Sequence, residues 1–506
     1  MAMRRSALLV LLVLLAAVAG GASPALAQSA PSAAALSGSN AGGDFDNDGF
    51  ADLAVGVPGE NNSAGAINVL YGTGGGLSGT GAQVFTQVGG ASEAFDSFGW
   101  ALAAGDFNND GFADLAVGAP FETLGGAQEA GAVSVLYGSA SGLTATGGQL
   151  FTQVGGAVED GDWFGFALAA GDFNNDGFAD LAAGAAGEAV GSAQGAGAVS
   201  VLPGSAGGLT ATGGRLFTQV GGAVEGGDQF GAALAAGDFN NNGFADLAAG
   251  APFEAVGSAG GAGAVSVLPG SAGGLTATGG QLFTQVAGNP EVGDQFGWAL
   301  AAGDFNNNGF ADLAAGAPNE AVGSAQAAGA VSVLPGSAGG LTATGGQLFT
   351  QVGGTVEALD LFGFALATGD VNNDGFADLA AGAPWERVGS IGLAGAVSVL
   401  PGSAGGLTAT GGQLFTQVGG TVEVADQFGA QLAAGDFNNN GFADLAAAAP
   451  QESVGSAFAA GAVSVLPGSA GGLTATGGRL FTQNSPGVPG VAEAFDLFGG
   501  VAFNAG

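Results

Sequence analysis

The apolar residues of this chain fall into short runs that are separated by Gly, Pro, Asn and Asp. Between residues 101 and 154 these runs occupy positions 101–105, 113–118, 132–137 and 149–154. β-Branched residues alternate with small ones in the third run, and a period of two is typical of strands. None of the four runs reaches the roughly 10 residues that a convincing helix needs. The pattern predicts four short strands in this stretch.

The same pattern recurs along the chain. A segment of the form Asp-x-(Asp/Asn)-x-(Asp/Asn)-Gly-Phe-Ala-Asp occurs seven times, with a first spacing of 62 residues and then five spacings of 66. Phe-Gly stands eight residues before it in every copy but the first. Gly-Ala-Pro or a variant, Gly-Ala-Val-Ser-Val-Leu and Gly-Gly-Gln-Leu-Phe-Thr-Gln-Val follow it. The seven segments begin at Asp44, Asp106, Asp172, Asp238, Asp304, Asp370 and Asp436.

Four short strands in each of seven repeats predict an all-β fold, a seven-bladed β-propeller of four-stranded antiparallel blades. A linear β-solenoid is the alternative, but its repeats are shorter and its two ends stay open.

The two ends of the repeat array favour a closed ring. The first repeat lacks Phe-Gly and has residues 36–43 in its place, whereas the chain ends with an eighth Phe-Gly that no Asp segment follows. We therefore expect residues 501–503 to form the innermost strand of the blade that contains Asp44, so that the C-terminal strand closes the ring. In the competing arrangement, residues 36–43 fill this place and the C-terminus is a frayed tail.

A leader precedes the repeats. Residues 1–5 are positively charged, the following stretch is rich in Leu, Val and Ala, and Ala25-Leu26-Ala27 forms a small-x-small cleavage site. This order predicts a signal peptide over residues 1–27, cleaved after Ala27, with a retained N-terminal anchor as the alternative. Residues 28–42 are expected to be a flexible segment and residues 43–506 the propeller. We expect a secreted protein, extracellular or at the cell surface, without membrane insertion after cleavage.

Composition narrows the chemistry further. The 506 residues include 42 acids and five Arg, give a net charge of -37, and contain no Lys, His or Cys. Nucleic-acid binding is excluded because it needs clustered positive charge. Disulfides, thiolate or imidazole metal sites and Cys or His catalysis are excluded as well. Oxygen ligands remain, and these suit calcium or magnesium.

The second repeat carries the marks of a known family at residues 98–99 (Phe-Gly), 106–114 (the Asp segment) and 118–120 (Gly-Ala-Pro). The chain resembles FG-GAP repeat proteins, namely the N-terminal β-propeller of integrin α subunits and bacterial secreted FG-GAP or VCBS-type proteins. The resemblance covers roughly residues 43–506, with departures such as Ala186 in place of Pro and Ala448 in place of Gly. It implies a seven-bladed propeller with calcium in the loops between the first and second strands of blades.

The Asp segment itself has the composition of a calcium loop. With Asp106 as position 1, side-chain oxygens stand at positions 1, 3, 5 and 9, and Gly at position 6 permits a sharp bend. With a carbonyl at position 7 this gives five or six oxygen ligands, which suits calcium better than octahedral magnesium. An EF-hand is excluded because Val117 stands where its last Glu would be. The alternative is an Asp/Asn-Gly turn without an ion, although its converging carboxylates would repel one another.

We expect up to seven calcium sites, the strongest in the loops that begin at Asp44, Asp106, Asp172 and Asp370, which hold three or four carboxylates. The other three loops have Asn at positions 3 and 5 and hold two. The candidate metal residues are Asp44, Asp46, Asp48, Phe50, Asp52; Asp106, Asn108, Asp110, Phe112, Asp114; Asp172, Asn174, Asp176, Phe178, Asp180; Asp238, Asn240, Asn242, Phe244, Asp246; Asp304, Asn306, Asn308, Phe310, Asp312; Asp370, Asn372, Asp374, Phe376, Asp378; and Asp436, Asn438, Asn440, Phe442, Asp444.

The positions of the Asp and Glu residues along the chain do not indicate a catalytic site. Apart from the loop acids, one Glu follows each Gly-Ala-Pro position and a Glu-x-x-Asp pair precedes each Phe-Gly, so that only Glu129 and Asp160 fall outside the repeats. A catalytic carboxylate should be a singular position in a repeat protein. We therefore expect no enzymatic activity.

The most variable segments between copies, such as 121–130 and 157–163, are expected on the face opposite the calcium loops, where loops on a rigid scaffold serve recognition. The interpretation is an extracellular binding or adhesion module, a monomer, whose partner is an extracellular protein or glycan. A secreted hydrolase or a lectin acting on polysaccharide is the alternative, and an integrin-like heterodimer is not implied. The candidate ligand-face residues are Phe121, Trp163, Phe253, Trp385, Arg387 and Phe458.

Overall fold

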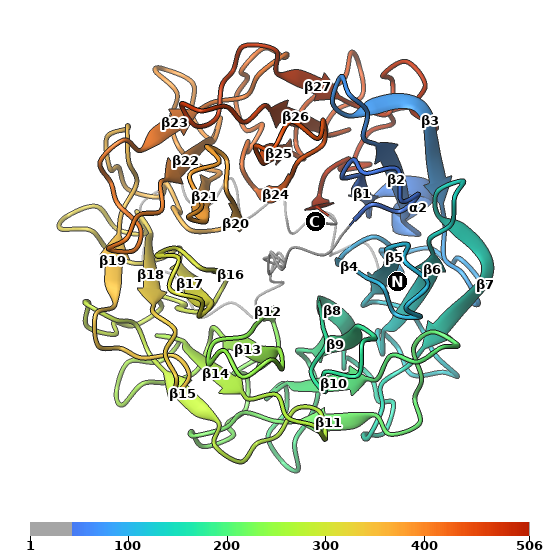
Figure 1. The fold of residues 1–506 in the computed structure, drawn as a ribbon, viewed down its shortest axis with the longest axis vertical. Coiled ribbons are helices and arrows are strands. Elements are labelled where there is room, and N and C mark those ends of the chain that lie inside the picture. Colours follow the sequence, from blue (N-terminus) through green and yellow to red (C-terminus); the bar gives the residue numbers. More distant parts are fainter. Residues whose placement is uncertain (1–42, 505–506) are drawn as a thin grey trace, which may run out of the picture. The chain divides into compact units, whose positions relative to one another are not determined.

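The computed structural model describes residues 43–504, which form seven four-stranded antiparallel sheets around a central axis (Figure 1). This confirms the predicted seven-bladed β-propeller. The signal peptide predicted for residues 1–27 and the flexible segment predicted for residues 28–42 lie outside the described residues. No helix within residues 43–504 is long and apolar enough to cross a membrane.

Each blade runs from an innermost strand near the axis to an outermost strand at the rim (Figure 1). In blade order the strands are β28 (Val501–Asn504), β1 (Leu53–Val57), β2 (Ala66–Tyr71), β3 (Ser78–Phe85); β4 (Leu102–Gly105), β5 (Asp114–Ala119), β6 (Ala132–Tyr137), β7 (Thr144–Phe151); β8 (Phe164–Gly171), β9 (Asp180–Ala185), β10 (Ala198–Leu202), β11 (Arg215–Phe217); β12 (Ala233–Gly237), β13 (Asp246–Ala251), β14 (Ala264–Leu268), β15 (Gln281–Phe283); β16 (Leu300–Gly303), β17 (Asp312–Ala317), β18 (Ala330–Leu334), β19 (Gln347–Phe349); β20 (Leu366–Gly369), β21 (Asp378–Ala383), β22 (Ala396–Leu400), β23 (Gln413–Phe415); and β24 (Gln431–Gly435), β25 (Asp444–Ala449), β26 (Ala462–Leu466), β27 (Arg479–Phe481). A four-residue helix, α2 (Glu60–Ser63), lies in the first blade.

Three of the four predicted strands of the second blade agree with the structure to within a residue, but the fourth is wrong in its bounds. It covers Thr144–Phe151 rather than residues 149–154. The chain leaves the sheet after Phe151 because it turns toward the next blade. There the Val154 amide donates to Ser200 Oγ at 3.3 Å, and Ser200 Oγ donates to the Val154 carbonyl at 3.1 Å. The end of the outer strand is therefore fixed by a contact between blades.

Small residues let the blades approach one another closely. A Cβ added to Gly118 in β5 would lie 2.1 Å from the carbonyl oxygen of Gly165 in the neighbouring blade. Contacts of this kind explain why Gly opens the Gly-Ala-Pro motif. The Phe of each Phe-Gly pair is buried at the same junctions, Phe98 and Phe164 being 0% exposed. The hydrophobic core therefore lies between the blades.

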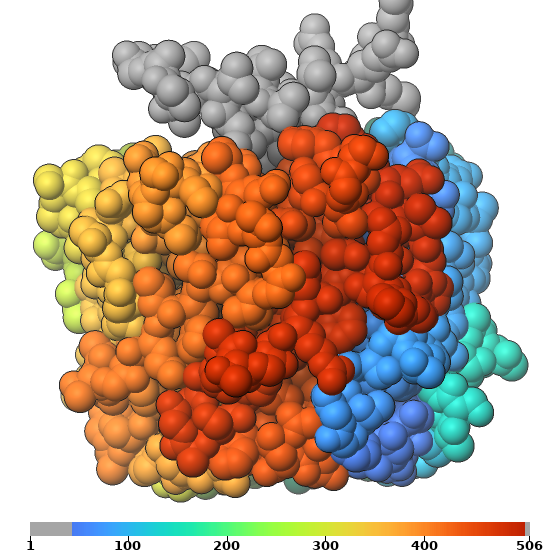
Figure 2. Space-filling view, turned by 90° about the horizontal axis from the view of Figure 1, so that it is seen from above, coloured from blue at the N-terminus to red at the C-terminus, as the bar shows by residue number. Residues whose placement is uncertain are grey.

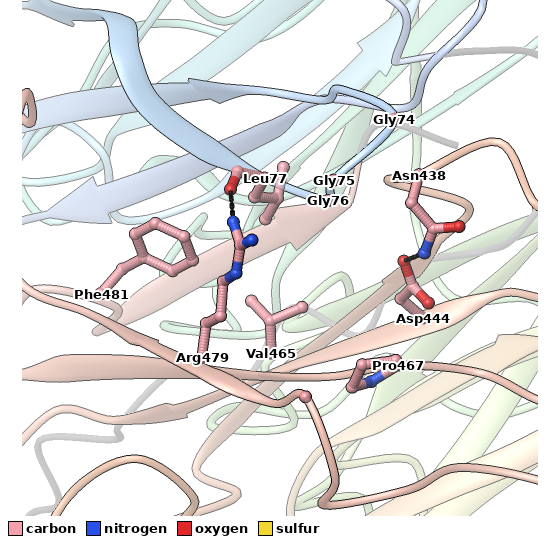
Figure 3. A pocket seen from close by; sticks show the side chains of 11 residues that line it. Gly74, Gly75, Gly76, Leu77, Asn438, Asp444, Val465, Pro467, Arg479 and Phe481 are labelled. Atoms are coloured by element: carbon pink, nitrogen blue, oxygen red, sulfur yellow. Dashed lines mark hydrogen bonds between the residues drawn. The ribbon is translucent and has the colours of Figure 1, made fainter.

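The ring closes through the C-terminal strand. β28 pairs antiparallel with β1, and Ala502 lies opposite Val55, so the predicted closure is confirmed and the competing arrangement with a frayed C-terminal tail is wrong. At the rim of the same junction Arg479 Nη1 donates to the Leu77 carbonyl at 2.9 Å (Figure 3). Figure 2 shows the last blade (red) packed directly against the first (blue).

Candidate metal centres and ligand face

The seven Asp loops lie at one end of the blades, between the first and second strands. In the second blade Asp106 follows β4 directly and Asp114 is the first residue of β5. The first blade differs because its first strand, β28, comes from the C-terminus, so that the loop from Asp44 to Asp52 precedes β1 without a covalent link to β28. Six loops therefore connect two adjacent strands as hairpins, whereas the loop of the first blade only leads into β1.

The carboxylate at position 9 organises each loop. Asp114 is 0% exposed, its Oδ2 accepts from the Phe107 amide at 3.0 Å, and its Oδ1 accepts from the Gly138 amide at 2.9 Å. Gly138 opens the Gly-rich connection between the third and fourth strands, so the two loops share a face as the meander predicts. Burial raises the pKa of Asp114 to about 7 and that of Asp52 to about 8.

Positions 1 and 5 bind backbone amides of their own loop. Asp106 accepts from the Asp110 amide at 3.1 Å and from the Gly111 amide at 2.9 Å, while Asp110 accepts from the Phe112 amide at 3.0 Å. These are the bonds of the Asp/Asn-Gly turn that the sequence left as an alternative. They do not exhaust the carboxylates, because each has about four acceptor sites.

Position 3 sorts the loops into two classes. Where position 5 is Asp, a position-3 side-chain oxygen is buried without a hydrogen-bond partner. These atoms are Asp46 Oδ1, Asn108 Oδ1, Asn174 Oδ1 and Asn372 Oδ1. Where position 5 is Asn, the position-3 Asn donates Nδ2 to the position-9 carboxylate at 2.7–2.8 Å, whereas Asn174 and Asn372 of the first class make the same bond at 3.3–3.4 Å. The shorter bonds join Asn240 to Asp246 at 2.7 Å, Asn306 to Asp312 at 2.7 Å and Asn438 to Asp444 at 2.8 Å, the last shown in Figure 3.

The residues of the first class fit a hard cation. A buried oxygen without a partner is costly unless something binds it. In the richest loop, oxygens of Asp44, Asp46 and Asp48 lie within 4.8 Å of one another. Burial, together with repulsion from Asp48 and Asp44, raises the pKa of Asp46 to about 6. A converging set of acidic and amide oxygens of this kind has the donor chemistry that calcium prefers.

Two of the predicted ligand-face residues meet in one aromatic cluster between the second and third blades. Phe121 and Trp163 have ring centroids 6.4 Å apart. Trp100 lies 5.2 Å from Phe121, and Phe166 lies 6.1 Å from Trp163 and 5.7 Å from Trp100, which completes a circuit of four rings.

The two acids outside the repeats adjoin this cluster. Trp163 Nε1 donates to Glu129 Oε2 at 3.2 Å. Asp160 accepts from the amide of Gln128, the residue before Glu129, at 2.9 Å. Both carboxylates are exposed. Sequence reasoning set these acids aside as exceptions to the repeat, whereas the structure places them beside the largest aromatic cluster of the described residues.

The other ligand-face residues are distributed around the ring. Phe253 lies 6.4 Å from Trp298, Phe458 lies 5.5 Å from Phe495, and half-buried Trp385 stands in the sixth blade. Arg387 forms a long ion pair of 4.0 Å with Glu357, in which both side chains are largely exposed. These positions share the face opposite the Asp loops, but they do not form a single site.

A comparison with family models gives seven matches to the FG-GAP repeat, one in each blade. The matched residues are 38–70, 98–136, 164–202, 230–268, 296–334, 362–400 and 428–466. The chain belongs to the FG-GAP repeat family.

Relatives of this FG-GAP protein include integrin α chains. Integrin alpha-V of Gallus gallus is 31% identical over 205 residues, which cover 40% of this chain and 18% of that protein. Phosphatidylinositol-glycan-specific phospholipase D of Rattus norvegicus is 35% identical over 148 residues, 28% of this chain and 17% of that protein. The chain thus matches less than a fifth of each relative's length. Among solved structures, a Bacillus licheniformis rhamnogalacturonan lyase aligns with 82% of this chain and 72% of its own at a TM-score of 0.35 and 12% identity, too distant to bear on function.

The FG-GAP propeller also contains a polar cluster that sequence reasoning missed. The Gln of each Phe-Thr-Gln segment is buried beside the Glu that follows Gly-Ala-Pro and the Asp that precedes Phe-Gly, as in Gln87, Glu122 and Asp96. All three positions were visible as periodic residues. Their convergence was not, because they come from parts of the repeat that only the packing of successive blades brings together.

Proposed function

We propose that this FG-GAP propeller is a secreted, calcium-stabilised module that binds an extracellular protein or glycan through the face opposite its Asp loops. The observation that carries the calcium part is the sorting of the loops at position 3. Buried oxygens without partners occur in the four loops that have a carboxylate at position 5. The predicted ranking by carboxylate count and this structural division select the same four loops.

In such a loop the side chains at positions 1, 3 and 5 would hold the ion, with position 9 beside them. In the second blade these are Asp106, Asn108, Asp110 and Asp114. Calcium would supply positive charge and ligand bonds in a protein whose net charge is -37. Relief of repulsion between carboxylates stabilises the folded state, since the unfolded chain does not hold them together.

The decisive experiment counts calcium ions in two reciprocal variants. Asp374→Asn converts a loop of the first class into one of the second, and Asn308→Asp does the reverse in the neighbouring blade. Equilibrium dialysis should show one tight site lost in the first variant and one gained in the second. Chelation with EDTA should lower the melting temperature of the parent protein by several degrees. An unchanged melting curve, or equal calcium counts in the parent and both variants, contradicts the calcium assignment.

The binding part rests on the aromatic cluster between the second and third blades. Trp and Phe beside exposed carboxylates combine apolar area with hydrogen-bond acceptors, a combination common at recognition surfaces. A glycan array and immobilised extracellular matrix proteins should retain the parent protein, and Trp163→Ala should reduce that binding at least tenfold. Phe253→Ala removes a comparable ring from the pair that it forms with Trp298 and should have little effect. Equal losses in both variants would indicate that neither ring marks a specific site.

Glu129 and Asp160 give the second candidate function its one specific observation. Two exposed carboxylates that break the repeat and adjoin half-buried aromatic rings are compatible with a polysaccharide hydrolase or lectin. Release of reducing ends from polysaccharides, abolished in Glu129→Gln or in Asp160→Asn, would support a hydrolase. Retention of a glycan without cleavage would support a lectin.

A further inference from the structure

A second polar ring lies on the face opposite the Asp loops. At each blade junction a Gln that follows the outer strand of one blade meets an Asp and a Glu of the next, and we name each such group a junction cluster. The clusters are Gln87, Asp96 and Glu122; Gln153, Asp162 and Glu188; Gln219, Asp228 and Glu254; Gln285, Asp294 and Glu320; Gln351, Asp360 and Glu386; Gln417, Asp426 and Glu452; and Gln483, Asp496 and Glu60.

These clusters are buried, except that Glu60 and Glu320 are only half-buried. In the first, Gln87 is 8% exposed, Asp96 2% and Glu122 5%. The Asp is held in place by its own turn, because Asp96 Oδ2 accepts from the Glu93 amide at 2.6 Å. Each junction cluster therefore places two carboxyl groups, at positions fixed by the fold, in an interior where unpaired charge is expensive.

The Gln is directed at the carboxyl pair. At the closing junction Gln483 Nε2 donates to Glu60 Oε2 at 2.7 Å. At the junction of the second and third blades, a Cβ added to Gly156 would lie 2.6 Å from Gln153 Nε2 and 3.3 Å from Glu188 Oε1, so the amide and the carboxylate face the same point.

Several atoms of the clusters have no hydrogen bond of normal geometry. In six clusters one Glu oxygen, such as Glu122 Oε2, and both amide atoms of the Gln, such as those of Gln87, are buried without a hydrogen bond of normal geometry, although Glu122 interacts with both Asp96 and Gln87. Buried polar atoms without well-formed hydrogen bonds destabilise the folded state.

Positive charge is also missing from the clusters. Among residues 43–504 the one ion pair joins Arg387 to Glu357, neither of which belongs to a cluster. Burial, together with the hydrogen bond and repulsion from the neighbouring Asp96, raises the pKa of Glu122 to about 7. A buried water could supply hydrogen bonds, but only a proton or a cation reduces the charge of the two carboxyl groups.

We propose that the junction clusters bind divalent cations, one at each blade junction, in a ring separate from the Asp loops. The ligands are a Glu carboxylate oxygen, the Asp oxygen that does not accept from the turn amide, and the Gln amide oxygen, with water completing the shell. Three protein oxygens with two carboxylates and retained water are the ligand set of magnesium or a loosely held calcium. The ion neutralises the carboxyl pair and connects the outer strand of one blade to the next blade.

The tryptophans allow a test of one cluster. Trp163 follows Asp162 in the chain, and its ring lies 3.2 Å from a Cβ added to Gly187, the residue before Glu188. The Asp loop of the same blade is at the other end of strands about six residues long, roughly 20 Å away. Energy transfer from Trp to bound Tb³⁺ falls steeply with distance, so Trp163 should sensitise an ion in the cluster and not one in the loop.

The experiment uses the full chain in which Trp100, Trp298 and Trp385 are replaced by Phe. Tb³⁺ should give Trp-sensitised emission that added calcium or magnesium displaces. Glu188→Gln and Gln153→Leu should each reduce this emission at least fivefold at a fixed Tb³⁺ concentration. Melting curves recorded in parallel establish that the variants are folded, and the shape-conserving Gln153→Leu serves if Glu188→Gln does not fold.

Two control variants locate the ion. Asp176→Asn, in the Asp loop of the same blade, should leave the emission unchanged. Asp160→Asn tests the exposed acid beside the aromatic cluster and should also leave it unchanged. Absence of emission in the parent, emission that survives both cluster variants, or emission abolished by either control would overturn the proposal.

Discussion

Removal of the closing strand gives the sharpest test of the ring. The variant ends after Gly500 and so lacks β28, which pairs with β1 through four residues, Leu53 to Gly56 on the β1 side. It keeps Phe498, which is 0% exposed, and the bond from the Gly59 amide to the Asp496 carbonyl at 3.0 Å. The truncation therefore removes the pairing but retains the packing of the last Phe-Gly.

The expected loss follows from the pairing. Four paired residues correspond to roughly four backbone hydrogen bonds, each worth about 1 kcal/mol net, so the free energy of unfolding should fall by about 4 kcal/mol. A domain of this size has an unfolding entropy of about 1 kcal/mol/K, from about 2.1 cal/mol/K per residue. The melting temperature should therefore fall by about 4 °C. The apolar strand Leu53–Val57 also becomes an open edge, and open edges promote association.

Differential scanning calorimetry measures the first effect and light scattering after size exclusion the second, over a range of protein concentrations. A variant that ends after Asn504 keeps β28 and should match the parent in both. A monomeric Gly500 truncation with an unchanged melting temperature would refute the closure argument, because it would mean that the pairing contributes nothing to stability.

Three further predictions concern the junctions. In EDTA, the pKa of Glu122, raised from 4.5 to about 7, makes the folded state hold a proton that the unfolded state releases, so stability should fall as pH rises from 5 to 8 in thermal melts. Gly250→Ala should lower the free energy of unfolding by about 3 kcal/mol in urea titrations, since its Cβ would lie 2.1 Å from the Gly297 carbonyl, whereas Gly260→Ala, with nothing within 4 Å, should be neutral. Arg479→Gln should be nearly neutral, because Gln281 makes the equivalent bond elsewhere, while Arg479→Ala should cost about 1 kcal/mol by the same titration.

The repeat made most of the fold predictable. Blade number, strand number and ring closure all follow from counting, because seven copies average out local ambiguity. Strand ends were less predictable. Thr152 to Val154 look like strand in sequence, yet they leave the sheet for Ser200 of the next blade. The contact with Ser200 cannot be predicted from residues 149–154 alone, because it depends on how the next blade packs.

The candidate sites show the same division. The ranking of the Asp loops was available from carboxylate counts, but the change at position 3 depends on how closely the Asn amide approaches the position-9 Asp, at 2.7 Å for Asn240 and 3.3 Å for Asn372. The aromatic cluster joins Trp100 to Phe166, which occupy equivalent positions 66 residues apart in adjacent blades. Residues at the same register become neighbours around a ring, a rule that could have predicted this contact.

The Asp loops and the closure of the ring are physically connected. Each loop donates an amide to the preceding one, as in Ala113 to the Asp44 carbonyl at 3.2 Å, and the series is completed by Ala51, which donates to the Asp436 carbonyl at 3.2 Å. This last bond joins the loop of the seventh blade to the loop of the first blade. The loop of the first blade is the one that has no covalent link to the innermost strand of its own blade, β28. This loop is also the one with four carboxylates, Asp44, Asp46, Asp48 and Asp52. A cation held at this position would stabilise the first loop in the conformation that both β28 and the last blade require. We infer that metal binding at Asp44 and pairing of β28 with β1 would stabilise each other, because both depend on the conformation of the loop from Asp44 to Asp52 that leads into β1.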